Sequence, residues 1–187
     1  MPNNKMHYIM TSITLGIIAA SSGLLIGLTN LATAKQIDIN KEKKINAGIT
    51  AIFGENAEIS TRSELKNNKY TNYVYKVKIE GESINKIALR TSGSNSYGKI
   101  TLLIGLAEYT LPDTDITEFV FQSTYVIEDE QTYASTLEDK YIDLINSKDT
   151  NGRDYKDVSC GATYGAKLVR DMIDEAKEVA NKEFRKG

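Results

Sequence analysis

The sequence predicts an α+β protein, an antiparallel sheet with flanking helices, preceded by a single N-terminal transmembrane helix. Three observations predict this layout. A long run near the N-terminus lacks charged residues, several short segments are rich in β-branched and aromatic residues, and the C-terminal segment has helical spacing of apolar residues. We expect a tail and anchor over residues 1–34, an amphipathic connecting helix and linker over 35–69, and the main domain over 70–187.

Composition narrows the classes of function. The formal net charge is −2, and no basic patch dominates, which argues against a nucleic-acid partner. The chain has one cysteine and one histidine, which excludes a disulfide framework and a zinc site built from Cys and His.

The first element is the uncharged run from Tyr8 to Ala34, which contains no Asp, Glu, Lys or Arg. A helix of about 20 apolar residues spans the hydrocarbon core of a bilayer. The alternative is a cleaved signal peptide, because Ala32-Thr33-Ala34 has the Ala-x-Ala form of a cleavage site. The run is longer than the usual apolar core of a signal peptide, about 7–15 residues, so we favour an uncleaved anchor.

Lysines flank this run unequally. Lys5 precedes it, whereas Lys35, Lys41, Lys43 and Lys44 follow it. Counted directly, the positive-inside rule places the C-terminal side in the cytoplasm, although long domains translocate largely regardless of charge.

Residues 35–53 are expected to be helical. Apolar side chains form one stripe along this helix, and we expect the helix to end at Gly54. The stripe consists of Ile45, Ile49, Ile52 and Phe53. We interpret this helix as a simple stalk between membrane and domain.

The sheet is expected after a polar stretch over residues 58–72, interpreted as a loop or frayed strand. Strands are predicted from their β-branched and aromatic content. They cover residues 73–79, 84–89, 100–106 and 116–127, with loops over 91–98 and 111–115.

Helices are expected toward the C-terminus. Residues 132–146 are interpreted as a loop leading into a short helix, and 147–156 as a polar connector. Apolar residues follow helical spacing throughout Lys167–Phe184. The opposite side carries acidic residues that we interpret as a solvated face: Asp171, Asp174, Glu175 and Glu178.

The segment Gly161-Ala162-Thr163, just before this last helix, is the main candidate for chemistry. Glycine allows close approach of another group, and a helix N-terminus presents free N–H groups and the positive end of the helix dipole. A phosphate is therefore stabilised there. The alternative role for Thr163 is an N-cap whose hydroxyl accepts a backbone N–H.

The surrounding run, Asp157-Val158-Ser159-Cys160-Gly161-Ala162-Thr163, resembles the flavinylation motif Asp-x-x-(Ser/Thr)-Gly-Ala-Thr of the FMN-binding domain family. The resemblance implies that Thr163 carries FMN through a phosphoester bond and that Asp157 is the motif aspartate. Cys160 stands where Ser or Thr is usual. Gly161 and Ala162 complete the implied cofactor-binding set at this end of the chain.

Other segments extend the resemblance to the G subunit of Rnf-type electron-transport complexes, which is related to the C subunit of sodium-translocating NADH:quinone reductase. Residues 28–34 resemble the end of that subunit's transmembrane helix. Residues 96–105 resemble the family's Gly-Tyr-Gly-Gly segment and the strand after it, and 166–176 resemble the helix after the flavinylated threonine.

The resemblance implies a single-pass membrane flavoprotein with an extracytoplasmic FMN domain over residues 70–187. It implies electron relay within an ion-translocating redox complex rather than stand-alone catalysis. The implied partners are the other subunits of that complex, a flavin transferase for maturation, and the membrane. An alternative from another class is a membrane-anchored binding or sensory module that keeps the fold without flavin.

The sequence also departs from the family pattern. Residues 130–137 lack the glycines of the family's Glu-Thr-Pro-Gly-Leu-Gly segment, and Gly165-Ala166 replaces a Ser/Thr pair. Thr132 and Tyr133 lie in the segment that matches the family's flavin-proximal loop, so we expect them at the cofactor. Two further tyrosines, Tyr97 and Tyr164, could stack on a flavin, with ordinary packing as the alternative. Two cations, Lys99 and Arg90, could pair with a phosphate, with simple solvation as the alternative.

Overall fold

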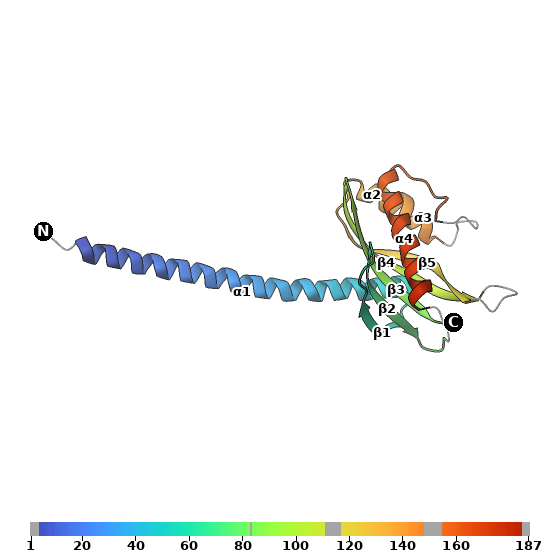
Figure 1. Cartoon of the computed structure of the whole chain (residues 1–187), viewed down its shortest axis with the longest axis horizontal. Helices are drawn as coiled ribbons and strands as arrows, with labels where there is room; N and C mark the ends of the chain where they lie inside the picture. The colour runs from blue at the N-terminus through green and yellow to red at the C-terminus, as the bar shows by residue number, and fades with distance from the viewer. Residues whose placement is uncertain (1–3, 83, 111–116, 148–154, 185–187) are drawn as a thin grey trace. The chain divides into compact units, whose positions relative to one another are not determined.

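The computed structural model describes residues 4–82, 84–110, 117–147 and 155–184. The chain divides into two compact units, Met1–Lys43 and Lys44–Gly187. One long helix is followed by a five-stranded antiparallel sheet and shorter helices, so the predicted α+β arrangement is confirmed (Figure 1). The predicted turn over 111–115, and most of the predicted connector over 147–156, lie outside the described residues.

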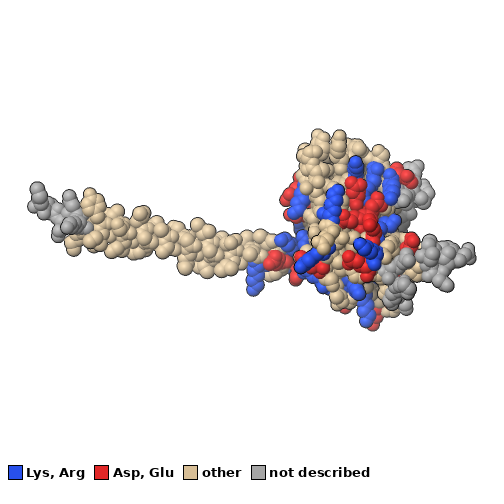
Figure 2. Space-filling view, viewed as in Figure 1, with Lys and Arg blue, Asp and Glu red and all other residues tan. Residues whose placement is uncertain are grey.

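The first unit consists of most of helix α1, Asn4–Phe53. The apolar stretch in this helix has a mean hydropathy of 1.9 and lies near the N-terminus. Figure 2 shows few charged atoms along it. Hydroxyl side chains such as Thr14 and Ser21 donate to the carbonyl oxygen four residues earlier, which satisfies them without water. The helix is long and apolar enough to cross a membrane, a property that signal sequences near an N-terminus share.

The second unit is built on a sheet in which each strand pairs with the next along the chain, in the order β1-β2-β3-β4-β5. Short loops suffice for such antiparallel neighbours. The strands are β1 Ala57–Glu64, β2 Thr71–Ile79, β3 Lys86–Asn95, β4 Gly98–Thr110 and β5 Thr117–Asp129.

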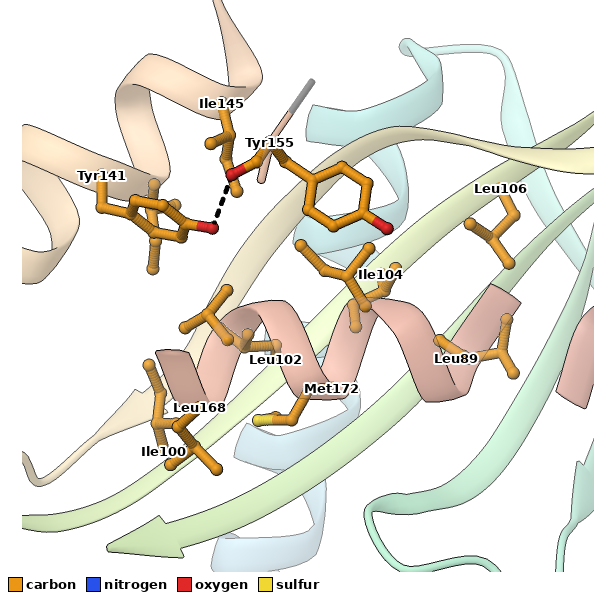
Figure 3. Close-up of a cluster of buried hydrophobic side chains, with 14 of the residues drawn as sticks. Leu89, Ile100, Leu102, Ile104, Leu106, Tyr141, Ile145, Tyr155, Leu168 and Met172 are labelled. Carbon is orange, nitrogen blue, oxygen red and sulfur yellow. Dashed lines mark hydrogen bonds between the residues drawn. The ribbon is translucent and has the colours of Figure 1, made fainter. Parts of the chain in front are cut away.

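Helices cover one face of this sheet and enclose the larger core (Figure 1). They are α2 Ala134–Leu137, the short π-helical turn η1 Glu138–Ile142, α3 Asp143–Asn146 and α4 Thr163–Glu183. Figure 3 shows Leu168 and Met172 of α4 beside Ile100 and Leu102 of β4, all buried. The apolar stripe predicted over 167–184 therefore faces the sheet, in a helix that begins four residues earlier than expected.

The opposite face of the sheet is covered by the last turns of α1. Ile45 and Ile49 are buried there in a second apolar cluster, together with Tyr75 and Leu103. The interpretation of this helix as a simple stalk is therefore wrong for residues 44–53, which belong to the core of the folded unit. The predicted boundaries at 34/35 and 69/70 stay predictions.

Glycines allow this close packing of helix on sheet. A Cβ at Gly48 would lie 2.9 Å from side-chain atoms of Leu103 and Tyr125. A Cβ at Gly105 would lie 2.3 Å from the Cγ2 of Ile52. Because carbon atoms do not approach this closely, a larger residue at either position would force the helix and the sheet apart or displace these buried side chains.

The hairpin between β3 and β4 differs from the prediction. Residues 91–98, interpreted as a loop from their Ser, Gly and Asn content, form the end of β3, a two-residue turn at Ser96–Tyr97, and the start of β4. Small residues are needed here because α4 crosses the strand, and a Cβ at Gly93 would lie 2.9 Å from Leu168. The polar stretch 58–72 likewise contains an edge strand, β1, whose side chains are mostly exposed.

The side-chain amides of two asparagines form hydrogen bonds with the backbone at the outer edge of β5. Asn146 accepts the N–H of Thr124 at 2.8 Å and donates to its carbonyl oxygen at 2.7 Å. Asn181 accepts the N–H of Phe119 at 2.8 Å. Each amide takes the place of a neighbouring strand, which fixes α3 and α4 on the sheet and covers an edge that would otherwise invite pairing.

The sequence suggested that the acidic side of α4 is a solvated face, but the structure shows that this holds for only part of it. Asp171 and Glu178 are exposed, but Glu175 is half-buried. The Glu175 carboxylate accepts backbone N–H groups of Lys69 at 3.2 Å, Tyr70 at 2.7 Å and Thr71 at 2.8 Å, so it holds the start of β2.

We therefore predict that Glu175→Ala lowers the free energy of unfolding by about 1.5–3 kcal/mol, the usual range for hydrogen bonds to a charged group. Glu178→Ala, an exposed acidic residue of the same helix, is the control and should change it by less than about 0.5 kcal/mol. Urea unfolding followed by circular dichroism measures both, and equal effects would show that the three bonds to Glu175 contribute nothing.

Candidate functional site

The candidate site lies where α4 begins, at Thr163. Ala162 occupies the N-cap position and offers no side-chain hydrogen bond. The N–H of Ala166 donates to the carbonyl oxygen of Ala162 at 2.9 Å, as the first turn of the helix forms. The N–H groups before Ala166 have no partner four residues earlier in the helix, which is the arrangement that favours an anion.

Thr163 is exposed, and its hydroxyl makes one long hydrogen bond, donating to the carbonyl oxygen of Cys160 at 3.4 Å. The alternative role proposed for Thr163, that of N-cap, is not adopted, because Thr163 is already the first helical residue. Its Oγ1 is therefore accessible for bonding to an incoming group.

A pocket of about 180 Å³ opens beside Thr163. Three tyrosines, the carboxamide of Gln131 and the first turn of α4 line this pocket, and none of these lining residues is charged. The lining residues are Tyr97, Gln131, Tyr133 and Gly161–Gly165.

The three tyrosine rings lie close together although they come from separate segments. Tyr97 sits in the β3–β4 turn, Tyr133 precedes α2, and Tyr164 is in the first turn of α4. The centroid of the Tyr97 ring is 5.8 Å from that of Tyr133 and 5.5 Å from that of Tyr164. Their exposed fractions are 36%, 56% and 64%, so one side of this aromatic wall faces solvent and can contact a planar ring.

Only some residues of the Asp157–Thr163 run lie at the pocket. Gly161, Ala162 and Thr163 line the pocket. Asp157 is exposed and is not among the lining residues. Cys160 is half-buried and packs against the larger core, as expected for a small apolar side chain.

The other predicted site residues divide in the same way. Tyr133 lines the pocket, whereas the Thr132 hydroxyl donates to the carbonyl oxygen of Tyr97 at 3.0 Å and so holds the turn that carries Tyr97. Arg90 stacks on Tyr73, on the face of the sheet that α1 covers. Lys99 alternates with buried Ile100 and therefore points to that same face. Neither cation lines the pocket.

Residues on α4 hold the segment that leads to Thr163. Arg170 donates to the carbonyl oxygen of Val158 at 2.9 Å and to the hydroxyl of Tyr141 at 3.2 Å. The Tyr141 hydroxyl donates in turn to the carbonyl oxygen of Tyr155 at 2.9 Å, the bond drawn in Figure 3. Sequence reasoning missed Arg170, although an arginine two turns after Thr163, directly before the acidic residues of the helix, was a usable signal.

Asp174 completes this attachment. It accepts a hydrogen bond from the Tyr155 hydroxyl and pairs with Lys156 at 2.9 Å. Partial burial acts to raise the pKa of Asp174, but the bonds from Tyr155 and Lys156 outweigh it and hold the pKa below the ordinary 3.8. A carboxylate whose pKa is lower in the folded state stabilises the fold above its ordinary pKa, and this contribution is lost as the pH falls through the folded value.

Asp174→Asn should therefore lower the free energy of unfolding at neutral pH, and the difference from the wild-type protein should shrink toward about pH 2. Urea unfolding at the two pH values tests this expectation. A loss of the same size at both values would mean that ionisation of Asp174 does not contribute.

Two further carboxyl groups are those of Asp129, which bonds the backbone of Gln131, and of Glu138, which interacts with Asp129. Asp129 accepts the backbone N–H of Gln131 at 2.7 Å, and burial raises its pKa. Burial also raises the pKa of Glu138, helped by the negative charge of Asp129. These two groups would oppose an additional negative charge in their neighbourhood, so an anion is better placed at the N-terminus of α4.

Comparisons of the chain with protein-family models, with curated proteins and with solved structures found no match. The resemblance to the FMN-binding domain family rests on the residues themselves and stays a prediction.

Proposed function

We propose that this protein is a membrane-anchored flavoprotein that relays electrons through an FMN attached to Thr163 by a phosphoester bond. The observation that carries the proposal is the position of Thr163. Its accessible hydroxyl lies at a helix N-terminus without a side-chain cap, inside an uncharged pocket with an aromatic wall.

Each part of this arrangement suits one part of FMN. The first N–H groups of α4 and its dipole can stabilise a phosphate esterified to Oγ1 of Thr163, without a lysine or arginine among the lining residues. The rings of Tyr97, Tyr133 and Tyr164 offer contact to an isoalloxazine ring. FMN supplies reversible electron transfer, and the protein supplies tethering, orientation and electrostatics.

The attachment segment is held firmly enough for this task. Arg170 and Asp174 of α4 form hydrogen bonds with Val158 and Tyr155, which precede Gly161. Helix α4 therefore holds both the start of the loop that leads to Thr163 and its end, where the helix begins. A tethered flavin would then keep a defined position relative to the pocket, which electron transfer between fixed partners requires.

The apolar stretch of α1 would serve as the anchor, since it is long enough to span a bilayer. We propose that it is not cleaved, that the FMN domain is extracytoplasmic, and that the partners are the other subunits of an ion-translocating redox complex of the Rnf type. A separate flavin transferase would form the ester bond by transferring the FMN phosphate from a flavin dinucleotide to Oγ1 of Thr163; the pyrophosphate bond breaks, the nucleoside monophosphate leaves, and Oγ1 loses its proton. Covalent attachment suits a flavin outside the cytoplasm, where a dissociated cofactor would be lost.

Orientation can be tested with a single cysteine. Glu80 is exposed in the turn after β2, so Glu80→Cys in a Cys160→Ala background should react with a membrane-impermeant thiol reagent on intact cells. The Cys160→Ala protein alone is the control for background labelling. Protection in intact cells with labelling only after lysis would place the domain in the cytoplasm.

The experiment that tests the function is in-gel fluorescence of the wild-type protein purified from its native host, with its intact mass. A flavin band that survives denaturation is expected, together with an intact mass equal to that of the full chain plus FMN less one water, which ester formation removes. A colourless protein with an unmodified mass would instead favour the flavin-free binding or sensory module. A mass lacking residues 1–34 would show that the N-terminal run is a signal peptide.

A further inference from the structure

Gln131 is a hydrogen-bonded polar side chain at the pocket. It lines the pocket, yet only 8% of it is exposed. Its Nε2 donates to the carbonyl oxygen of Gly98 at 2.8 Å and to Oδ1 of Asn95 at 3.2 Å. Both partners belong to the β3–β4 hairpin, on the two sides of the turn that carries Tyr97.

The same residue is fixed from two other directions. Its backbone N–H donates to Asp129 at the end of β5. Its Oε1 lies 3.3 Å from the position that a Cβ would take at Gly165, so the carboxamide rests against the first turn of α4. A side chain at position 165 would press on this carboxamide and on Leu137, whose Cδ2 lies 3.0 Å from the same Cβ position.

Further hydrogen bonds connect Asn95 to Tyr97, and Tyr97 to the segment that carries Tyr133. The Oδ1 of Asn95 also accepts the N–H of Tyr97 at 2.8 Å, and the carbonyl oxygen of Tyr97 accepts the N–H of Thr132 at 2.8 Å. Gly98 has φ +135°, and a Cβ there would lie 2.3 Å from the carbonyl oxygen of Glu130, so the hairpin and the segment after β5 are in direct contact.

We infer that Gln131 is a positioning residue. Its carboxamide locks the turn that carries Tyr97 to the segment that carries Tyr133 and to the first turn of α4, which carries Tyr164, so that the three rings form one wall against an aromatic ring system attached at Thr163. The ligand part of this inference rests on the proposed function, whereas the locking part does not.

The test uses the full chain carrying its flavin, with Gln131→Leu and Gln131→Glu. The controls are Gln122→Leu and Gln122→Glu, at an exposed glutamine of β5. In-gel fluorescence after denaturation should be equal in all five proteins, since Gln131 does not form the ester. Tyrosine rings in contact with a flavin quench its fluorescence, so the native wild-type protein should be quenched relative to the same sample after denaturation, and Gln131→Leu should lose this quenching.

The Gln131→Glu variant separates positioning from general damage to the fold. An ionised carboxylate at this position can still accept from Nδ2 of Asn95, which lies 3.4 Å from Oε1 of Gln131, but it has no proton to donate to the carbonyl oxygen of Gly98, so quenching should be lost at neutral pH. Protonation restores a donor, and quenching should return in acid, at a pH above the ordinary glutamate pKa of about 4.3, because burial and the carbonyl oxygen of Gly98 disfavour the charge. Gln122→Glu should show no such step.

Unchanged quenching in both Gln131 variants would overturn the inference. If the wild-type protein carries no flavin, the proposed function fails, and hydrogen exchange then decides on the locking role. The amides of Tyr97 and Thr132 should exchange faster in Gln131→Leu than in Gln122→Leu, and equal rates would overturn it.

Discussion

Replacement of Thr163 by alanine is expected to abolish covalent flavin while leaving the folded domain intact. The hydroxyl oxygen is the proposed point of attachment, and alanine has no atom that can form the ester. The loss of stability should stay below about 1 kcal/mol, because the hydrogen bond that the exposed hydroxyl donates to the carbonyl oxygen of Cys160 is long, at 3.4 Å. In-gel fluorescence and urea unfolding measure the two effects separately.

Two controls sharpen this prediction. Ser159→Ala removes an exposed hydroxyl four residues earlier and should leave the flavin in place. Thr132→Ala removes the hydroxyl that bonds the carbonyl oxygen of Tyr97 and should also leave the ester intact. Persistence of in-gel flavin fluorescence in Thr163→Ala would exclude Thr163 as the attachment residue.

The second large effect concerns the last turns of α1. Ile49 is 1% exposed and packs with Tyr75 and Leu103 on the face of the sheet opposite α4. Ile49→Ala should lower the free energy of unfolding by about 2–5 kcal/mol, because it removes buried methyl groups and leaves a cavity. Urea unfolding of the full chain in detergent measures the change.

Ile37→Ala, at an exposed isoleucine earlier in the same helix, is the matched control and should change stability by less than about 0.5 kcal/mol. Similar small effects of both substitutions would restore the interpretation of this helix as a stalk. A large effect of Ile49→Ala alone would confirm that the folded domain includes residues 44–53.

Local patterns made much of the fold predictable. The strands around residues 73–79 and 100–106 have the composition of strands, and Leu168, Met172 and Ala176 repeat at helical intervals, so each element could be assigned from its own residues. The stretch 91–98 could not, because its small residues are there to admit Leu168 of α4, a contact that composition does not reveal. The packing of Ile49 on the sheet was missed for the same reason, because an apolar stripe on a helix does not indicate which surface it packs against.

The site was predictable only in its contiguous part. Gly161, Ala162 and Thr163 follow one another and precede a recognisable helix, so their place at a helix N-terminus could be expected. Tyr97 and Gln131 are far from them in sequence and reach the pocket only through the pairing of β3, β4 and β5. Their roles depend on tertiary contacts, which no local pattern encodes.

The most direct measurement is tandem mass spectrometry of peptides from the wild-type protein purified from its native host. We predict one modified peptide, with the mass of FMN less one water added on Thr163 and no such addition on the hydroxyls of Thr132 or Ser159. An unmodified peptide containing Thr163 as the only form, or FMN found on another residue, would contradict it.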